Sequence, residues 1–323
     1  MRRAFNQYYN HTIHPELMRL ERTRMRLLRL IAISIVALVL VFILEGIINE
    51  WILTLVLTIP IGIYLFYLVR RVRQFRQRFK PLIVNLILDY LDDSPNFGEL
   101  RYDAKETISP EIVAASGLFA SSMDEFLGED YIEGKIGDMG FALSEIRIRE
   151  FSQVRNRLNY VFYGVFMVAQ LSNKYKGAFR LWPKEFKQYL TRALKQADKQ
   201  GLKPVPGMMQ AKGFNDLFLT AGKTGTILSE LINEPLQRAL VAYRTSTNQP
   251  IYLSIHDSVI CLAITEKKDL LEPKIFQSNL SYDLIREFFA DIDSALTLIR
   301  LLEGSDPEEV LSLEAPSKMN QKK

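Results

Sequence analysis

Two uninterrupted apolar runs dominate the pattern of hydrophobic and polar positions near the start of the chain. The first, residues 30–44, contains no charged residue, and the second, residues 51–69, is nineteen uncharged residues long. A helix rises roughly 1.5 Å per residue, so the second run spans about 28 Å, close to the ~30 Å hydrocarbon core of a bilayer. The pattern therefore predicts a transmembrane helical hairpin over residues 30–69, with a break at residues 45–50.

Basic residues gather beside these two runs and predict the orientation of the hairpin. Seven arginines precede the first run and six basic residues follow the second, whereas the loop between them carries only Glu45 and Glu50. The positive-inside rule then predicts a multi-pass protein of the cytoplasmic (inner) membrane with both termini in the cytoplasm. A cleaved signal peptide is the alternative for the first run, but no small-x-small cleavage pattern follows Leu44.

The charge of the remaining chain narrows the class of partner. Residues 1–80 contain thirteen Lys and Arg against four Glu, whereas the remainder contains 28 basic and 33 acidic residues. A mildly acidic soluble part argues against nucleic acid as a partner, because nucleic-acid binding needs a basic face. Cys261 is the only cysteine, so no disulfide forms within the chain, as in proteins of a reducing compartment.

A helical stalk is expected to continue out of the second run. Apolar residues recur at spacings of three and four along residues 70–93, namely at Val72, Phe75, Phe79, Leu82, Leu86 and Tyr90. Such a stripe packs against another helix, either of the same chain or of a second copy, so homo-oligomerisation through the stalk is the alternative to packing within the chain. A second helix is expected from Pro15, and the turn-rich residues 92–98 should form a linker.

The soluble part combines short strands and helices. Ser109-Pro110 predicts a helix over residues 112–120, with Ser at the cap and Pro at the first position. Alternating or continuous apolar stretches predict seven strands, at residues 131–137, 141–149 (with a bulge at Ser144-Glu145), 160–171, 178–182, 239–244, 251–255 and 259–265. Helices are predicted at residues 228–237 and 282–303, and a loop at residues 201–228.

The predicted helix 183–200 has an unusual charge distribution. Its apolar face is surrounded by five basic residues, which are our candidate membrane-surface contacts: Lys184, Lys187, Arg192, Lys195 and Lys199. A basic amphipathic helix of this kind docks on anionic lipid headgroups. The alternative is a solvated helix that simply covers the sheet.

No catalytic set emerges from the motifs of the chain. Gly222-Lys223-Thr224 lacks the earlier glycine of a phosphate-binding loop. His256-Asp257-Ser258 contains residue types that are used in acid–base chemistry, but a tight polar turn explains the same residues equally well. Oxygen ligands for magnesium or calcium could come from an acidic group, if its members converge in space: Glu129, Asp130, Glu133 and Glu145. We therefore expect no cofactor and no catalytic residue, with a carboxylate metal site as the alternative.

Several strings resemble a bacterial family catalogued as domain of unknown function 3137 (DUF3137). The resemblance rests on Ser116-Gly-Leu-Phe119, the string from Gly128 to Gly137, Ser144-Glu145, Phe162-x-Gly164-x-Phe166, Asn173-Lys174 with Gly177, the hairpin from Ile251 to Ile264 and the ending from Pro273 to Leu302. Within the string, Gly128, Glu129, Asp130 and Gly134 are the candidate interaction or structural signature. The resemblance implies paired transmembrane helices before a soluble domain, but no activity. This chain departs from the family where a helix expected between Arg244 and Ile251 is cut to a turn.

These observations together predict a tethered α+β protein with a mainly antiparallel sheet and a long C-terminal helix, by analogy a small pleckstrin-homology-like barrel. Five segments are expected: a basic cytoplasmic segment (1–29), the transmembrane hairpin (30–69), a juxtamembrane stalk and linker (70–97), a cytoplasmic α+β domain (98–303) and a disordered tail (304–323). The expected function is that of a non-enzymatic interaction or lipid-surface module with anionic lipid as a partner. A metal-dependent enzyme and an accessory subunit of a transporter or envelope complex are the alternatives.

Overall fold

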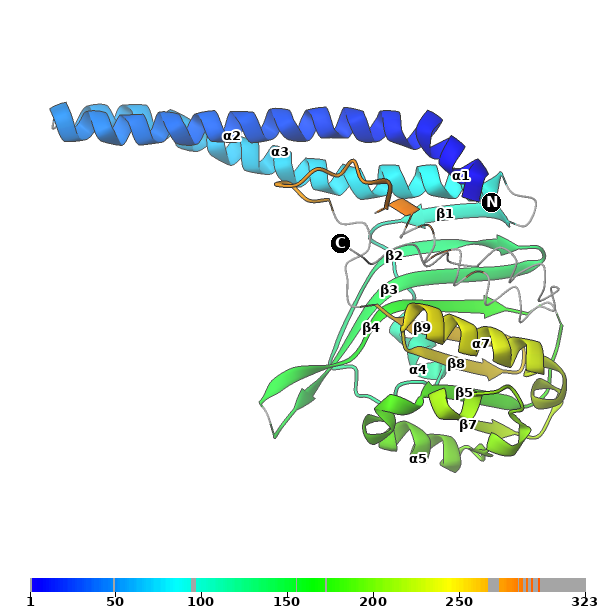
Figure 1. The fold of residues 1–323 in the computed structure, drawn as a ribbon. Helices are drawn as coiled ribbons and strands as arrows, with labels where there is room; N and C mark the ends of the chain where they lie inside the picture. The colour runs from blue at the N-terminus through cyan, green and yellow to red at the C-terminus, as the bar shows by residue number, and fades with distance from the viewer. Residues whose placement is uncertain are drawn as a thin grey trace. The chain divides into compact units, whose positions relative to one another are not determined.

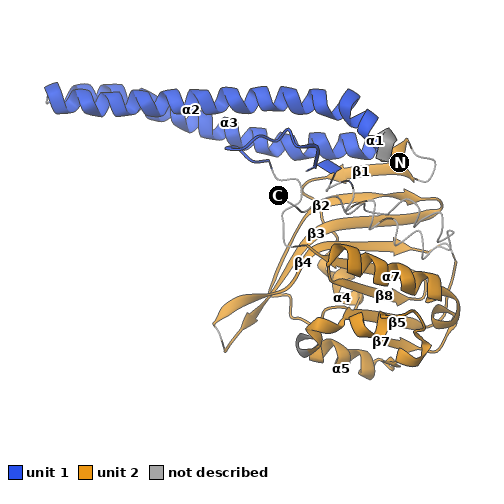
Figure 2. Cartoon of the chain, in the orientation of Figure 1, with its two compact units in different colours: residues 1–90, 270–289 blue, residues 91–269, 290–323 orange. Residues whose placement is uncertain are grey.

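A computed structural model describes residues 2–48, 50–93, 97–154, 156–171, 173–266 and 273–283, together with residues 285, 286, 289, 292 and 296. The chain divides into two compact units (Figure 2). Unit 1 contains residues 1–90 and 270–289, and unit 2 contains residues 91–269 and 290–323. Most of the predicted helix 282–303 and all of the tail 304–323 lie outside the described residues.

Unit 1 is built on a long helical hairpin (Figure 1). Its elements are α1 (Arg2–Tyr8), a π-helical turn (Tyr9–Ile13), α2 (His14–Ile48) and α3 (Trp51–Asp92). Helix therefore begins well before Pro15, and the predicted break at residues 45–50 is shorter than expected because α2 continues to Ile48. The stalk prediction is confirmed, since α3 runs on through Pro60 and Pro81.

The apolar runs of α2 and α3 are largely exposed within the described chain. In the most apolar window of each helix, only 11% and 6% of the residues are buried. Large side chains such as Ile33, Phe42 and Phe66 have 65%, 51% and 74% of their surface exposed. A core helix of a soluble protein would bury such residues. Both helices are long and apolar enough to cross a membrane, and the residues that the structure describes leave most of their apolar surface exposed.

The apolar stripe of the stalk packs against the rest of its own chain. Phe79 is completely buried, and the Tyr8 hydroxyl donates a hydrogen bond to the Leu86 carbonyl oxygen at 3.0 Å. The Phe5 ring stacks on Phe289 at 4.2 Å and meets Tyr90 edge-on at 5.2 Å. Packing within the chain is therefore the arrangement found, and these aromatic residues of the stalk are already covered.

Unit 2 contains one nine-stranded sheet in which every pair of neighbours is antiparallel. Its strands are β1 (Phe97–Asp103), β2 (Glu125–Ile136), β3 (Met139–Ser152), β4 (Arg157–Gln170), β5 (Ala178–Pro183), β6 (Lys203–Pro204), β7 (Phe218–Lys223), β8 (Ile251–His256) and β9 (Val259–Thr265). The spatial order is β1-β2-β3-β4-β9-β8-β5-β7-β6, so the β8–β9 hairpin inserts between β4 and β5. The α+β prediction is confirmed, but among the described residues β1 and β6 do not pair, so the sheet stays open and the barrel analogy is wrong.

Short helices flank the sheet (Figure 1). They are α4 (Pro110–Ala115), a 3₁₀ turn (Lys184–Tyr189), α5 (Thr191–Lys199), a 3₁₀ turn (Pro206–Met208), α6 (Phe214–Leu217), a π-helical turn (Ile227–Leu231) and α7 (Glu234–Thr247). The Ser109 side chain caps α4 by accepting from the Ile112 backbone N–H, as predicted, although α4 ends at Ala115. The predicted helix 183–200 is instead a 3₁₀ turn followed by α5.

Three local predictions are wrong. Residues 239–244 belong to α7, because the Asn233 side chain caps a helix that buries Leu236, Leu240 and Tyr243 on one face. β7 lies within the predicted loop 201–228, where its buried pairing with β5 overrides the Gly and Pro content. The bulge lies in β2, between Glu129 and Ile132, rather than in β3.

Candidate functional site

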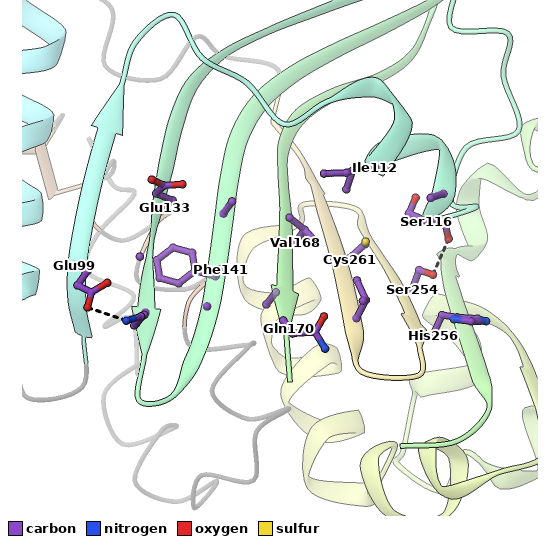
Figure 3. A pocket seen from close by; sticks show the side chains of 17 residues that line it. Glu99, Ile112, Ser116, Glu133, Phe141, Val168, Gln170, Ser254, His256 and Cys261 are labelled. Carbon is purple, nitrogen blue, oxygen red and sulfur yellow. Dashed lines mark hydrogen bonds and ion pairs between the residues drawn. The ribbon is translucent and has the colours of Figure 1, made fainter. Parts of the chain in front are cut away.

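A pocket of about 760 Å³ lies on one face of the sheet in unit 2. In Figure 3, Ile112 of α4 and Ser116, which directly follows α4, form one wall, and the strands form the floor, with Phe141, Val168 and Cys261 labelled. Small residues leave the space open, since Gly134, Gly140, Ala142 and Ala169 occupy lining positions on β2, β3 and β4. Volumes of this size are typical of small-molecule sites.

The polar lining of the pocket divides between its two ends (Figure 3). Glu99, Glu133 and Lys135 lie at the β1–β2 end, where Lys135 pairs with Glu99 at 2.8 Å and Glu133 pairs with Arg101 at 2.6 Å. Serines mark the other end, where the Ser254 hydroxyl donates to the Ser116 carbonyl oxygen at 2.7 Å.

Cys261 and His256 also line the pocket, and neither has the surroundings of a catalytic residue among the residues that the structure describes. Burial raises the pKa of the Cys261 thiol to about 12, so the thiolate is scarce at neutral pH. His256 and Asp257 meet at 3.1 Å in the β8–β9 turn, where both side chains are largely exposed. Within the described residues no serine, cysteine or third partner joins this pair by a hydrogen bond, and the tight-turn interpretation of His256-Asp257-Ser258 accounts for it.

The five candidate membrane-surface residues are all exposed, on the 3₁₀ turn before α5 and on α5 itself. The apolar side of α5 belongs to the core of the sheet, where Leu190, Ala193 and Ala197 are buried. Two of the basic residues have contacts within unit 2, since Lys184 donates to the Asn215 carbonyl oxygen and Arg192 pairs with Glu150. The helix therefore covers the sheet and also presents a basic surface to solvent.

Three members of the predicted acidic group converge. Ligand oxygens of Glu129, Asp130 and Glu145 lie within 4.8 Å of one another, which the bulge in β2 makes possible. Arg147 contacts both Glu129 and Glu145 at 3.0 Å and so supplies positive charge to the cluster. The fourth member, Glu133, turns away to Arg101.

The signature glycines have a packing role. A Cβ at Gly128 would lie 1.9 Å from the Thr107 hydroxyl oxygen, and one at Gly134 would lie 2.5 Å from a Leu100 methyl carbon. Asp130 adopts a positive φ of 60°, and its carboxylate accepts a hydrogen bond from the Tyr102 hydroxyl at 2.6 Å. These residues let the segment 98–107 lie close against β2.

Arg180 on β5 is the residue that sequence reasoning missed. Its side chain is buried, with 7% of its surface exposed, and its Nη1 atom has no hydrogen-bond partner. Burial lowers the pKa of the Arg180 guanidinium. The one available signal was an arginine within a short strand whose other residues are apolar.

Comparison with known proteins gives a single result. Residues 160–303 match the model of the family described as "Protein of unknown function (DUF3137)", from β4 through β9 and beyond. The string from Gly128 to Gly137 lies outside the matched range, as does the helical hairpin. The predicted strand that ends near Arg244 is part of the helix α7, and the departure from the family at this place stays a prediction. No curated protein and no solved structure matches the chain. The predicted resemblance to DUF3137 is thus confirmed over residues 160–303.

Proposed function

We propose that this protein is a membrane-tethered, non-enzymatic module whose soluble unit engages the surface of anionic lipid. The α2–α3 hairpin is the tether in the inner membrane, and the flanking basic residues keep both termini and unit 2 in the cytoplasm. The observation that carries the proposal is the exposed basic surface of residues 184–199, on the 3₁₀ turn and α5, whose apolar side already packs in the core.

Charge and position make this surface suited to headgroups. Lys187, Lys195 and Lys199 are exposed and make no ion pair with any residue that the structure describes. Free ammonium groups on one short segment attract anionic lipid, and the tether raises their local concentration at the membrane. Burying a hydrophobic face in the lipid is not required, because the apolar side of α5 packs on the sheet.

The test uses the full chain in nanodiscs of phosphatidylglycerol or of phosphatidylcholine. Mass spectrometry measures the rate at which each lysine is acetylated. We expect Lys187, Lys195 and Lys199 to react several-fold more slowly in the anionic discs, and the protection to vanish in about 1 M salt, where the screening length falls to roughly 3 Å. Lys105 and Lys174, which are exposed elsewhere on unit 2, are the internal controls.

Charge reversal separates lipid binding from general crowding by the disc. The double variant Lys187→Glu, Lys195→Glu should remove the protection of Lys199. The matched control, Lys105→Glu with Lys174→Glu, has the same net charge and should leave that protection unchanged. Equal acetylation of Lys199 in both kinds of disc for the wild type would refute the proposal.

The alternative of a metal-dependent enzyme rests on the convergence of Glu129, Asp130 and Glu145. Arg147 weakens it, because a guanidinium that contacts two of the three carboxylates competes with a cation for their charge. The alternative of an accessory subunit that docks through the stalk is weakened by Phe5 and Tyr8, which pack against the stalk within unit 1.

A further inference from the structure

The β3–β4 hairpin extends past the rest of the sheet as a two-stranded ribbon (Figure 1). β2 pairs with β3 no further than Glu125 opposite Arg149, and β9 pairs with β4 no further than Thr265 opposite Gly164. Within the described part of the sheet, residues 150–159 therefore pair only with one another. Two strands without a further layer form no core, so the apolar side chains of this ribbon stay in contact with solvent.

Large apolar side chains are exposed along the ribbon. Val154, in the turn, has 98% of its surface exposed, and Phe151, Leu158 and Tyr160 have 46%, 38% and 62% exposed. Phe151 and Leu158 are directly paired, and Tyr160 follows Leu158 by two residues, so these three side chains project to one face. Apolar side chains grouped in this way mark an interaction surface, in contrast to the single exposed residues that are normal on any protein.

The charge of this segment indicates an anionic partner. The sequence from residue 151 to residue 184 contains no Asp or Glu, and it includes Arg155 and Arg157. Arg157 is exposed. At the base of the ribbon, the Arg149 guanidinium lies over the Tyr160 ring, 5.2 Å from its centroid, and pairs with Glu125 at 2.5 Å. The nearest carboxylate of β2 is thus already partnered, and the turn end of the ribbon is basic.

The base of the ribbon also adjoins the basic surface of residues 184–199. Arg192 of that surface pairs with Glu150, the β3 residue directly before Phe151. The lysines of the basic surface and the apolar turn of the ribbon therefore belong to neighbouring parts of unit 2.

We propose that the β3–β4 ribbon inserts its turn into the interfacial region of an anionic bilayer, with Phe151 and Val154 below the headgroups and Arg157 among the phosphates. This inference rests on the proposed function and deepens it, because it adds apolar insertion to the attraction of the lysines. A guanidinium matches phosphate oxygens in bidentate geometry. The Tyr160 ring combines an apolar body with a polar hydroxyl, as is typical of residues at the membrane–water interface. The proposed tether keeps a bilayer at a high effective concentration, which favours lipid over a protein partner as the occupant.

The experiment uses the full chain in phosphatidylglycerol nanodiscs that contain a lipid with a nitroxide near the top of its acyl chain. Gln153→Cys places a fluorescent label beside Val154, and Lys105→Cys places the same label at an exposed site elsewhere on unit 2. Cys261, the only native cysteine, is 4% exposed, so the label reacts at the introduced cysteine. Insertion by roughly 5–10 Å, the depth at which interfacial segments bury their apolar faces, brings the label at position 153 close to the nitroxide. We expect several-fold stronger quenching at position 153 than at position 105, and equal quenching would overturn the proposal without any further variant.

Two double variants test whether the apolar side chains drive insertion. In the protein labelled at position 153, Phe151→Ser with Val154→Ser should remove most of the quenching. The matched control, Met208→Ser with Val259→Ser, also replaces two exposed apolar side chains of unit 2 and should leave the quenching unchanged. Equal quenching in the two double variants would contradict the role of the ribbon.

The outcomes separate this inference from the proposed function. Protection of Lys199 from acetylation without quenching at position 153 would overturn this inference alone. Quenching at position 153 without protection of Lys199 would support insertion and refute only the role of the basic surface. A label at position 153 that brightens in the discs but is not quenched by the nitroxide would lie against protein, so a second copy or another protein would replace lipid as the occupant and the inference would be overturned.

Discussion

Replacement of Arg180 by methionine should stabilise the protein. The buried Nη1 atom has no partner, and such a group costs about 1–3 kcal/mol of folding free energy. Methionine keeps most of the aliphatic stem that packs along the strand and removes the polar head. We therefore expect the free energy of unfolding of unit 2 to rise by about 1–3 kcal/mol.

The size of unit 2 converts this gain into a measurable shift. For domains of about 150–250 residues, each 1 kcal/mol moves Tm by about 2–4 °C, so the variant should melt a few degrees higher. Trp182 is fully buried in unit 2 and donates its indole N–H to the Leu118 carbonyl oxygen at 3.0 Å, so its fluorescence reports this unit. Trp51 is the only other tryptophan, and Trp51→Phe in both proteins makes the signal specific.

Arg244→Met is the matched control. Arg244 is buried to the same degree as Arg180, with 8% of its surface exposed, but it bonds to Asn248 at 2.8 Å and to Glu185 at 2.7 Å. Loss of hydrogen bonds to a charged group should lower Tm rather than raise it. If Arg180→Met lowers Tm as much as Arg244→Met does, Arg180 is a structural residue and the reasoning above is refuted.

Four further outcomes are expected. Gly128→Ala should destabilise unit 2 by about 1–3 kcal/mol through overlap with Thr107, whereas Gly140→Ala, which meets open space, should change Tm little; equal effects in thermal melts would contradict the packing role. Alkylation of Cys261 at pH 8 should run about a thousandfold slower than that of a free cysteine, because a pKa raised from 9.0 to about 12 leaves the thiol protonated until the pH approaches 12. The raised pKa also means that the contribution of Cys261 to stability is present below pH 9 and is lost as the pH rises towards 12. Thermal melts at a series of increasing pH values should show this loss as a fall in Tm. Added magnesium or calcium should leave the Tm unchanged, and a rise in Tm that Glu145→Gln abolishes would establish the carboxylate metal centre instead.

The acidic residues show how far local sequence can lead towards a site. Glu129 and Asp130 are adjacent in sequence, and Glu145 belongs to the next predicted strand, so their convergence was within reach of a hairpin argument. Glu133 looked equivalent in the sequence, but it turns to Arg101 on β1, a strand that the pattern did not predict. The members of a cluster therefore depend on neighbours that local spacing does not reveal.

The sequence by itself determined the helical hairpin, the antiparallel strands around the Gly137 turn and the β8–β9 hairpin, because these depend on apolar run length and on turns between adjacent segments. Residues 239–244 were assigned to the wrong element because a short apolar run fits both a strand and a helix. Only the tertiary structure decided that β8 and β9 insert between β4 and β5, since that pairing joins strands far apart in sequence. The same insertion places Ser254 between Cys261 and Arg180, so this row of residues exists only in the folded sheet.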